Sequence, residues 1–231
     1  MTSSASSVSR IPPVITIDGP VASGKGTVAR ALASRLGFQL LDSGAIYRAH
    51  ALACIDRSIK HSEIKLLEDE AKALSLEFRG ESVWVDGRDA TELIRAEAVG
   101  MAASAISAIP EVRAALLQRQ RAFAVSPGLV ADGRDMGTVV FPNAQLKVYL
   151  TATAEVRGQR RSRQIENAAG SAGANAELAQ VISQIRQRDL QDKSRATAPL
   201  RPAADAIVLD NAGQHKNETV EAILRLWSLR V

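Results

Sequence analysis

A glycine-rich stretch directly behind the apolar run Val14–Ile17 carries the residue types that bind phosphate. The stretch reads Asp18-Gly19-Pro20-Val21-Ala22-Ser23-Gly24-Lys25-Gly26-Thr27. Its glycines permit backbone angles that are closed to other residues, so main-chain N–H groups can converge on an anion. Lys25 can reach the β- and γ-phosphates of a nucleotide, and a hydroxyl that follows it can ligate Mg²⁺. The stretch therefore predicts a phosphate-binding P-loop for a nucleoside triphosphate.

The residue order in this stretch departs from the most common P-loop pattern. In that pattern Ser or Thr follows the lysine directly, whereas here Gly26 intervenes and Thr27 follows. The Gly-Lys-Gly-Thr form resembles the loop of nucleoside monophosphate kinases more than that of GTPases or motor ATPases. The alternative interpretation is a glycine-rich turn between a strand and a helix. Apolar residues at i, i+4 and i+8 (Val28, Leu32, Leu36) predict the helix that a P-loop requires, and they favour phosphate binding.

A second segment with polar residues follows the apolar run Phe38–Leu41. It reads Asp42-Ser43-Gly44-Ala45-Ile46-Tyr47-Arg48. Asp42 or Ser43 is placed to cap the next helix, and capping does not exclude contact with a ligand. Arg48 is less easily explained by local structure, and we expect it to emerge near a strand end beside the P-loop.

A third segment, Asp132-Gly133-Arg134-Asp135-Met136-Gly137, follows the apolar run Leu129–Ala131. An acidic residue at such a strand end commonly positions Mg²⁺ through water, which makes Asp132 a candidate for that role. Arg134 could neutralise a phosphate. The plain alternative for this segment is a structural Asp-Gly turn.

A long basic segment near the C-terminus supplies cations that could act in phosphoryl transfer. Between residues 157 and 201 the basic residues are Arg157, Arg160, Arg161, Arg163, Arg186, Arg188, Lys193, Arg195 and Arg201. A solvated charged helix is the plain explanation for such a cluster. Phosphoryl transfer spreads negative charge over the equatorial oxygens of the moving group, so arginines on a closing segment would stabilise its transition state. We interpret Arg163, Arg186 and Lys193 as surface residues.

The composition is that of an ordinary globular protein and argues against several classes of function. Of 231 residues, 46% are hydrophobic and only 3% are aromatic, so stacking platforms for nucleic acid are not expected. A net charge of +4 suits anionic ligands but is too small to demand a nucleic-acid or membrane partner. Cys54 is the only cysteine, which fits a reducing, cytoplasmic compartment. Because its neighbours are apolar, we interpret Cys54 as a core residue and not as a nucleophile.

Short apolar runs that recur along the chain predict a parallel sheet. They cover Val14–Ile17, Phe38–Leu41, Leu129–Ala131, Leu146–Leu150 and Ile207–Leu209. Helical patterns separate most of these runs, which favours an α/β fold whose sheet is covered on both faces. Ligands bind such folds at the carboxyl ends of the strands, and the polar segments described above follow those ends.

A tail and two inserted segments lie outside the predicted core. The Ser-rich residues 1–13 predict a disordered tail and not a signal peptide, and no apolar run approaches the length of a membrane span. Within residues 66–107, Leu76–Phe78 and Val83–Val85 predict a hairpin, followed by an Ala-rich helix with Met101 and Ile106. The basic segment is expected to be helical at both ends and mobile between Ala168 and Ala176.

From Val14 to about Asp210 the chain resembles the bacterial cytidylate kinases, which are P-loop nucleoside monophosphate kinases. The resemblance rests on the motifs Ile17–Pro20, Gly24–Thr27, Leu41–Arg48, Gly128–Pro142 and Arg195–Leu200. The P-loop alone is common to many families, whereas segments 42–48 and 131–142 together are much more specific. The resemblance implies a P-loop NTPase-type five-stranded parallel sheet flanked by helices, within a kinase domain at 14–231. It also implies a nucleoside-monophosphate-binding (NMP-binding) insert at about 66–107 and a short lid at about 158–194.

The resemblance further implies transfer of the γ-phosphate of ATP to CMP or dCMP, with Mg²⁺ carried on ATP. The residues implied to bind CMP are Ser43, Tyr47, Arg48, Ser104, Arg113, Arg134, Asp135, Arg188, Asp192 and Arg195. Those implied to bind ATP are Gly19, Pro20, Val21, Ala22, Ser23, Gly24, Lys25, Gly26, Thr27 and Arg157. Catalytic roles fall to Lys25, Arg134, Arg161 and Arg188, and Mg²⁺ contacts fall to Thr27 and Asp132. A cytoplasmic monomer that binds neither nucleic acid nor membrane is expected.

The assignment of base-reading residues depends on the resemblance alone, because Ser104 and Arg113 would otherwise be unremarkable helix residues.

Two other functions stay open from the residues themselves. One is a P-loop kinase for another small acceptor, such as UMP, dTMP or shikimate. The other is a regulatory or nucleic-acid-binding protein that uses a nucleotide as a switch, which the pI near 9.5 favours and the few aromatic residues disfavour.

Overall fold

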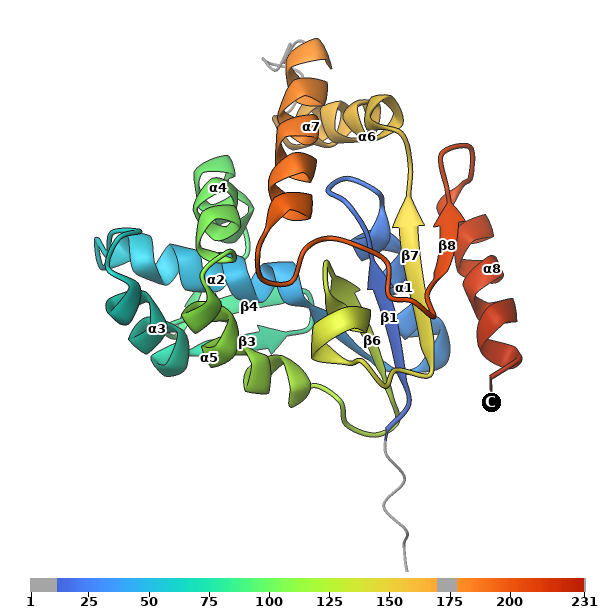
Figure 1. The fold of residues 1–231 in the computed structure, drawn as a ribbon, viewed down its shortest axis with the longest axis horizontal. Helices are drawn as coiled ribbons and strands as arrows, with labels where there is room; N and C mark the ends of the chain where they lie inside the picture. The colour runs from blue at the N-terminus through green and yellow to red at the C-terminus, as the bar shows by residue number, and fades with distance from the viewer. Residues whose placement is uncertain (1–11, 170–177, 231) are drawn as a thin grey trace, which may run out of the picture.

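The computed structural model describes residues 12–169 and 178–230. A parallel sheet of five strands forms its centre, in the order β2-β6-β1-β7-β8 (Figure 1). The strands are β1 (Val14–Asp18), β2 (Gln39–Asp42), β6 (Leu129–Gly133), β7 (Leu146–Thr151) and β8 (Ile207–Asp210). All five expected strands are present, with ends that differ from the apolar runs by one or two residues.

Two apolar cores cover the two faces of this sheet. Alternate residues of a strand point to opposite faces, and Val14 and Ile15 accordingly pack into different cores. Ile15 and Ile17 face α1 (Lys25–Leu36) and α8 (Lys216–Ser228). The other face is covered by α2 (Ser43–Asp56), which is buried along most of its length, Cys54 included. The expected doubly covered α/β sheet is therefore confirmed.

A second, smaller sheet lies beside the core, on the left in Figure 1. The expected hairpin is confirmed as β3 (Leu76–Arg79) paired antiparallel with β4 (Ser82–Val85), to which β5 (Arg88–Asp89) adds a third strand. Helices α3 (Ile64–Ala73), α4 (Glu97–Ile106) and α5 (Pro110–Arg121) pack with α2 and this sheet in one continuous apolar core. The Ala-rich helix expected after the hairpin is α4.

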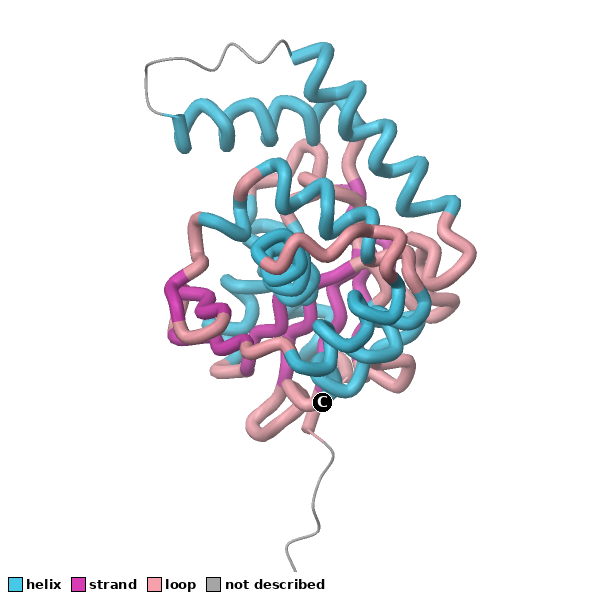
Figure 2. Tube along the Cα trace, turned by 90° about the vertical axis from the view of Figure 1, so that its left-hand side faces the viewer, coloured by secondary structure: helices cyan, strands magenta, loops and turns pink. Residues whose placement is uncertain are grey.

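Two long helices, α6 (Ala154–Ala169) and α7 (Leu178–Ser194), pack on one another above the carboxyl end of the sheet (Figures 1 and 2). A Cβ on Gly158 would lie 2.4 Å from the Ile182 side chain, so this side chain of α7 packs directly against the backbone of α6. The basic segment is thus helical on both sides, as expected. Most of the stretch expected to be mobile, Ala168–Ala176, lies outside the described residues, as do residues 1–11 of the expected tail.

Within the described part of the chain, no single helix is long and apolar enough to cross a membrane. Helices α4 and α5 pass that test only when taken together, and they are bent by 103° at their junction.

Candidate active site

The glycine-rich stretch connects the end of β1 to the start of α1, which is the placement that a P-loop requires. A Cβ on Gly19 would lie 2.2 Å from the Leu150 carbonyl oxygen, so a larger residue would force the loop off β7. Gly24 caps α1 with φ of 88°, in the left-handed region that favours glycine. Residues 19–27 therefore present the N-terminus of α1 as an anion site, and we call them the donor side.

Lys25, the first residue of α1, and Asp132, near the end of β6, are both buried and close enough to influence each other's charge. The Lys25 ammonium donates to the Pro20 carbonyl over 3.3 Å. Burial, reinforced by the nearby Arg134, lowers the pKa of Lys25, while Asp132 acts in the opposite sense. Burial likewise raises the pKa of Asp132. An anion that entered here would restore the charged form of Lys25, and a cation would restore the charged form of Asp132.

The Asp132 carboxylate faces the first turn of α1. A Cβ on Gly26 would lie 3.0 Å from Asp132 Oδ2, so the glycine leaves space for the carboxylate. Among the described residues, Asp132 Oδ1 is buried without a hydrogen-bond partner. Thr27 is exposed on the same turn. An oxygen donor of this kind beside a phosphate loop fits Mg²⁺ that arrives on a nucleotide.

The loop after β6 is tied to two other elements. The Ser43 hydroxyl donates to the Asp132 carbonyl over 2.8 Å, and the helix cap expected from Asp42 or Ser43 is made by Asp42, which accepts from the Ala45 amide. Asp18 at the end of β1 accepts from the amides of Met136 and Gly137, both over 2.8 Å. Burial raises the pKa of Asp18 to about 6, against the effect of these two hydrogen bonds.

A buried ion pair joins Arg113 of α5 to Asp135. Arg113 also donates to the Ser107 carbonyl over 3.1 Å, and its guanidinium carbon lies 5.7 Å from the centre of the Tyr47 ring. Burial raises the pKa of Asp135, although Arg113 acts to lower it. Ser104, one turn before Ser107 on α4, lines the same pocket. This end of the pocket offers a carboxylate, a guanidinium and a hydroxyl close together.

Arginines converge at the other end of the pocket around the buried Asp192. Arg134 Nε lies 3.0 Å and Arg195 Nη2 lies 2.5 Å from its carboxylate. Burial, together with neighbouring Arg134, lowers the pKa of Arg188 to about 10. Positive charge thus exceeds negative charge here, which favours an anionic ligand.

Arg48 enters this region from α2 and donates to the Ile94 carbonyl over 2.9 Å. Its guanidinium lies against Gly100, where a Cβ would come within 2.8 Å of the Arg48 side chain. The absence of a side chain at Gly100 thus leaves room for the guanidinium in its present position.

A pocket of about 180 Å³ gathers all ten residues expected to bind the acceptor. Its lining includes Lys25, Ser43, Tyr47, Arg48, Ser104, Arg113, Asp132, Arg134, Asp135, Arg188, Asp192 and Arg195. We call it the acceptor pocket. The sequence-based residue set is thus brought together in space, while the role of each member stays a prediction.

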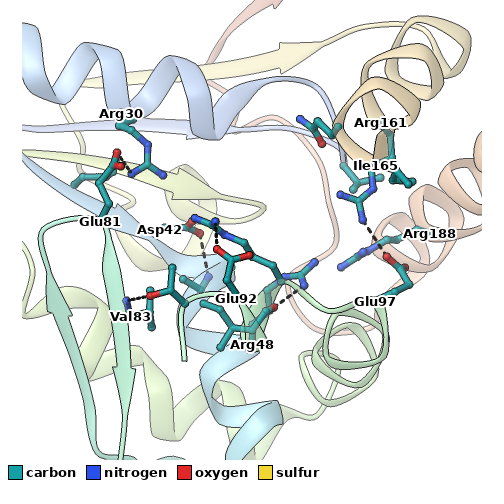
Figure 3. A pocket seen from close by; sticks show the side chains of 18 of the residues that line it. Arg30, Asp42, Arg48, Glu81, Val83, Glu92, Glu97, Arg161, Ile165 and Arg188 are labelled. Atoms are coloured by element: carbon teal, nitrogen blue, oxygen red, sulfur yellow. Dashed lines mark hydrogen bonds and ion pairs between the residues drawn. The ribbon is translucent and has the colours of Figure 1, made fainter. Parts of the chain in front are cut away.

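Arg161 and Arg157 lie outside this pocket. Arg161 lines the adjoining cleft of about 1,060 Å³, where it forms an ion pair with Glu97 over 3.0 Å (Figure 3). Arg157 is buried, donates to the Val21 carbonyl over 3.1 Å and pairs with Asp189 over 2.5 Å. Arg163, Arg186 and Lys193 are exposed, as expected.

Three residues that we did not predict to act in the site contact its loops. They are Asp18, Arg160 and Asn211, of which the last two contact the donor side. Asn211 directly follows the strand Ile207–Asp210, and its position as a polar residue at a strand end was the available signal. Arg160 carried no signal beyond the general basicity of its segment.

The sheet order, the P-loop after the central strand and the arginine-rich pocket beside it together define a P-loop phosphotransferase. The family model for cytidylate kinase matches residues 15–228. The chain is 52% identical to a cytidylate kinase from Bordetella bronchiseptica, over 93% of this chain and 95% of that one. It is 50% identical to cytidylate kinases from Chromobacterium violaceum (92% and 94%) and Saccharophagus degradans (94% and 97%). The chain belongs to the cytidylate kinase family, and it is a kinase.

Among solved structures, a gluconokinase from Sinorhizobium meliloti aligns with 96% of this chain and 95% of its own. The sequence identity is 15% and the TM-score is 0.46.

Proposed function

We propose that this chain transfers the γ-phosphate of ATP to CMP or dCMP, giving ADP and CDP or dCDP. The observation that carries the proposal is the Arg113–Asp135 pair beside Ser104, in the same pocket as Lys25 and the arginines around Asp192. One end of that pocket suits the edge of a base, and the other end suits a phosphate. Family membership supports the same acceptor.

Cytosine fits the polar groups at the base end better than uracil does. Its N4 amino group donates, and its N3 and O2 accept, which matches a carboxylate and a hydroxyl facing N4 and an arginine facing the ring. Uracil would bring a carbonyl towards Asp135 and an N–H towards Arg113. Buried polar groups left unpaired in this way give strong discrimination between ligands.

The transfer itself needs positioning and charge stabilisation more than proton removal. An acceptor phosphate is already an anionic nucleophile, so no strong general base is required. We propose that Lys25 and the amides of residues 19–27 bind the β- and γ-phosphates of ATP. Arg134, Arg188 and Arg161 stabilise the charge of the moving phosphoryl group, and the first two also bind the acceptor with Arg48, Asp192 and Arg195.

We propose that ATP enters with its Mg²⁺, for which Thr27 and Asp132 are the oxygen donors of this chain. The buried, unpartnered Asp132 Oδ1 supports this assignment. Mg²⁺ neutralises charge on the β- and γ-phosphates, and Arg157 contacts the ATP side from α6.

The organisation expected from the sequence is retained as part of the proposal. Residues 66–107 act as the NMP-binding insert, and residues 158–194 act as the lid. The protein works as a cytoplasmic monomer on small nucleotides, without a nucleic-acid or membrane partner. The single, buried Cys54 is compatible with a reducing compartment.

The proposal is tested by coupled ADP release with CMP, dCMP, UMP, dUMP, AMP and dTMP as acceptors. CMP and dCMP should give the highest kcat/KM by roughly 10²-fold or more over UMP. A preference for UMP, dTMP or AMP would contradict the reading of the base edge. ATP hydrolysis that none of the acceptors stimulates would contradict the transferase proposal as a whole.

A further inference from the structure

Two side chains from remote parts of the chain hold one carbonyl of the P-loop. The Ser23 carbonyl accepts from Asn211 Nδ2 over 2.9 Å and from Arg160 Nη1 over 3.1 Å. Arg160 also donates to Asn211 Oδ1 over 3.0 Å and to the Asn211 carbonyl over 2.7 Å. Arg160 belongs to α6, and Asn211 follows β8. Ser23, Arg160 and Asn211 therefore form a closed hydrogen-bonded triangle.

The held carbonyl belongs to the peptide that leads into Gly24. In a trans peptide the C=O and the following N–H point in opposite directions, so fixing the Ser23 oxygen also fixes the direction of the Gly24 amide. Gly24 has φ of 88°, and glycine restrains its own backbone least of all residues. A restraint from outside the loop can therefore set the direction of this amide, which belongs to the loop proposed to bind the phosphates.

The triangle leaves both functional groups of the Asn211 side chain occupied. This side chain is 4% exposed; its amide nitrogen bonds Ser23, and its oxygen bonds Arg160. Burying an amide beside a guanidinium is unfavourable unless both are fully hydrogen-bonded. One turn earlier on α6, Arg157 donates to the Val21 carbonyl over 3.1 Å. Helix α6 therefore holds the P-loop by hydrogen bonds to two of its carbonyls.

We propose that Asn211 and Arg160 are positioning residues for the triphosphate of ATP: they orient the Gly24 amide of the P-loop through the Ser23 carbonyl. This inference rests on the proposed use of residues 19–27 to bind ATP phosphates. It adds two residues to the donor side, and it makes the position of α6 part of the phosphate site.

The test compares ATP with inorganic tripolyphosphate, which has the phosphates but no nucleoside. Affinities of both for Asn211→Leu and Arg160→Gln are measured by calorimetry with Mg²⁺ present. Loss of a buried hydrogen bond that orients a phosphate donor should weaken ATP and tripolyphosphate by a similar factor, roughly tenfold. CMP affinity should stay within about twofold, and KM for ATP should rise while KM for CMP does not.

Arg163→Gln is the matched control, because Arg163 is exposed on the same helix and should leave both affinities unchanged. Weaker binding of ATP with unchanged binding of tripolyphosphate would overturn the proposal in favour of a contact with the nucleoside. Unchanged binding of both would overturn it outright, as would a parallel loss of CMP binding in both folded variants. If Asn211→Leu does not fold, Arg160→Gln decides, since its partly exposed side chain is removed at lower cost to the core. Tripolyphosphate binding needs no acceptor, so this result is independent of the acceptor panel.

Discussion

The donor side and the acceptor pocket offer different chemical groups to a phosphate. Between Gly19 and Gly24 the donor side presents main-chain amides, and Lys25 is the only cation in residues 19–27. The acceptor pocket instead uses charged side chains from α2, α5, α7 and the loop after β6, with Asp135 and Asp192 buried among arginines. Amides bind any polyphosphate, whereas a set of side chains can distinguish one base from another. We therefore expect specificity to be concentrated in the acceptor pocket.

Removal of Lys25 should have the largest effect, because it deletes the one side-chain charge of the donor side. We expect Lys25→Ala to lower kcat by roughly 10³-fold or more, since we propose that the lysine acts on the transferring phosphates. Its contacts within the protein are few, so the thermal unfolding midpoint followed by circular dichroism should change little. An unfolded variant would mean that Lys25 serves the fold and not the chemistry.

Asp135→Asn should change the acceptor pocket and leave the donor side intact, because the substitution alters only the selection of the base. An amide can donate to the uracil carbonyl, and it loses the charge-assisted bond to cytosine N4. We expect kcat/KM for CMP to fall by roughly 10²-fold while that for UMP falls much less. KM for ATP should be nearly unchanged. If CMP and UMP activities drop in parallel, Asp135 serves only the loop or its ion pair with Arg113.

Asp18 connects the two halves, and its titration should appear in stability. Its pKa is about 6 in the folded protein against an ordinary value of 3.8, so the folded state binds the proton more tightly. The resulting stabilisation is complete below pH 4 and is lost as pH rises to about 6. Relative to Asp18→Asn, the wild type should lose about 2 kcal/mol of unfolding free energy between pH 4 and pH 6. Urea unfolding at pH 4, 5, 6 and 7 measures this; parallel curves for the two proteins would refute it.

The arginines of α6 and α7 should affect turnover more than ground-state binding. We expect Arg161→Ala and Arg188→Ala each to lower kcat by roughly tenfold, with a smaller rise in KM. Arg186→Ala is the control, because Arg186 is exposed on α7 and pairs with the exposed Glu155. Steady-state kinetics with both substrates varied measures the split. A change in KM alone would show that these arginines only bind substrate.

Thr27→Val should give the smallest effect. The hydroxyl is exposed on the first turn of α1, so its loss should hardly alter stability. We expect a few-fold increase in the Mg²⁺ concentration needed for half-maximal turnover, since one oxygen donor is removed. Superimposable Mg²⁺ titrations of variant and wild type would remove Thr27 from the metal site.

The contrast between the donor side and the acceptor pocket also explains which parts of the site could be predicted from the sequence. The donor side is contiguous, so its glycines, Lys25 and the following helix are visible in ten consecutive residues. The sheet was predictable because each strand is a short apolar run between helical patterns. Ser104 and Arg113, by contrast, lie on two separate helices, and only the family resemblance pointed to them.

Tertiary contacts account for the residues that the sequence did not reveal. The bond from Asn211 to Ser23 joins residues 188 positions apart, and no local pattern encodes it. Asp18 was visible at the end of a strand, but its bonds to Met136 and Gly137 depend on the pairing of β1 with β6. Residues that act through another loop are found only when the loops are seen together.

The pairing of β1 with β6 also fixes how the P-loop and the loop after β6 are placed relative to each other. Asp18, the last residue before the donor side, is level with Gly133 in the parallel ladder, and β7 pairs with the other edge of β1. Adjacent strands are about 4.8 Å apart because main-chain hydrogen bonds fix that spacing. The chain segments that lead to donor and acceptor thus start from neighbouring strands at a common height. We therefore expect that substitutions of pocket side chains leave the relative placement of these two loops unchanged, because main-chain hydrogen bonds of the sheet set it.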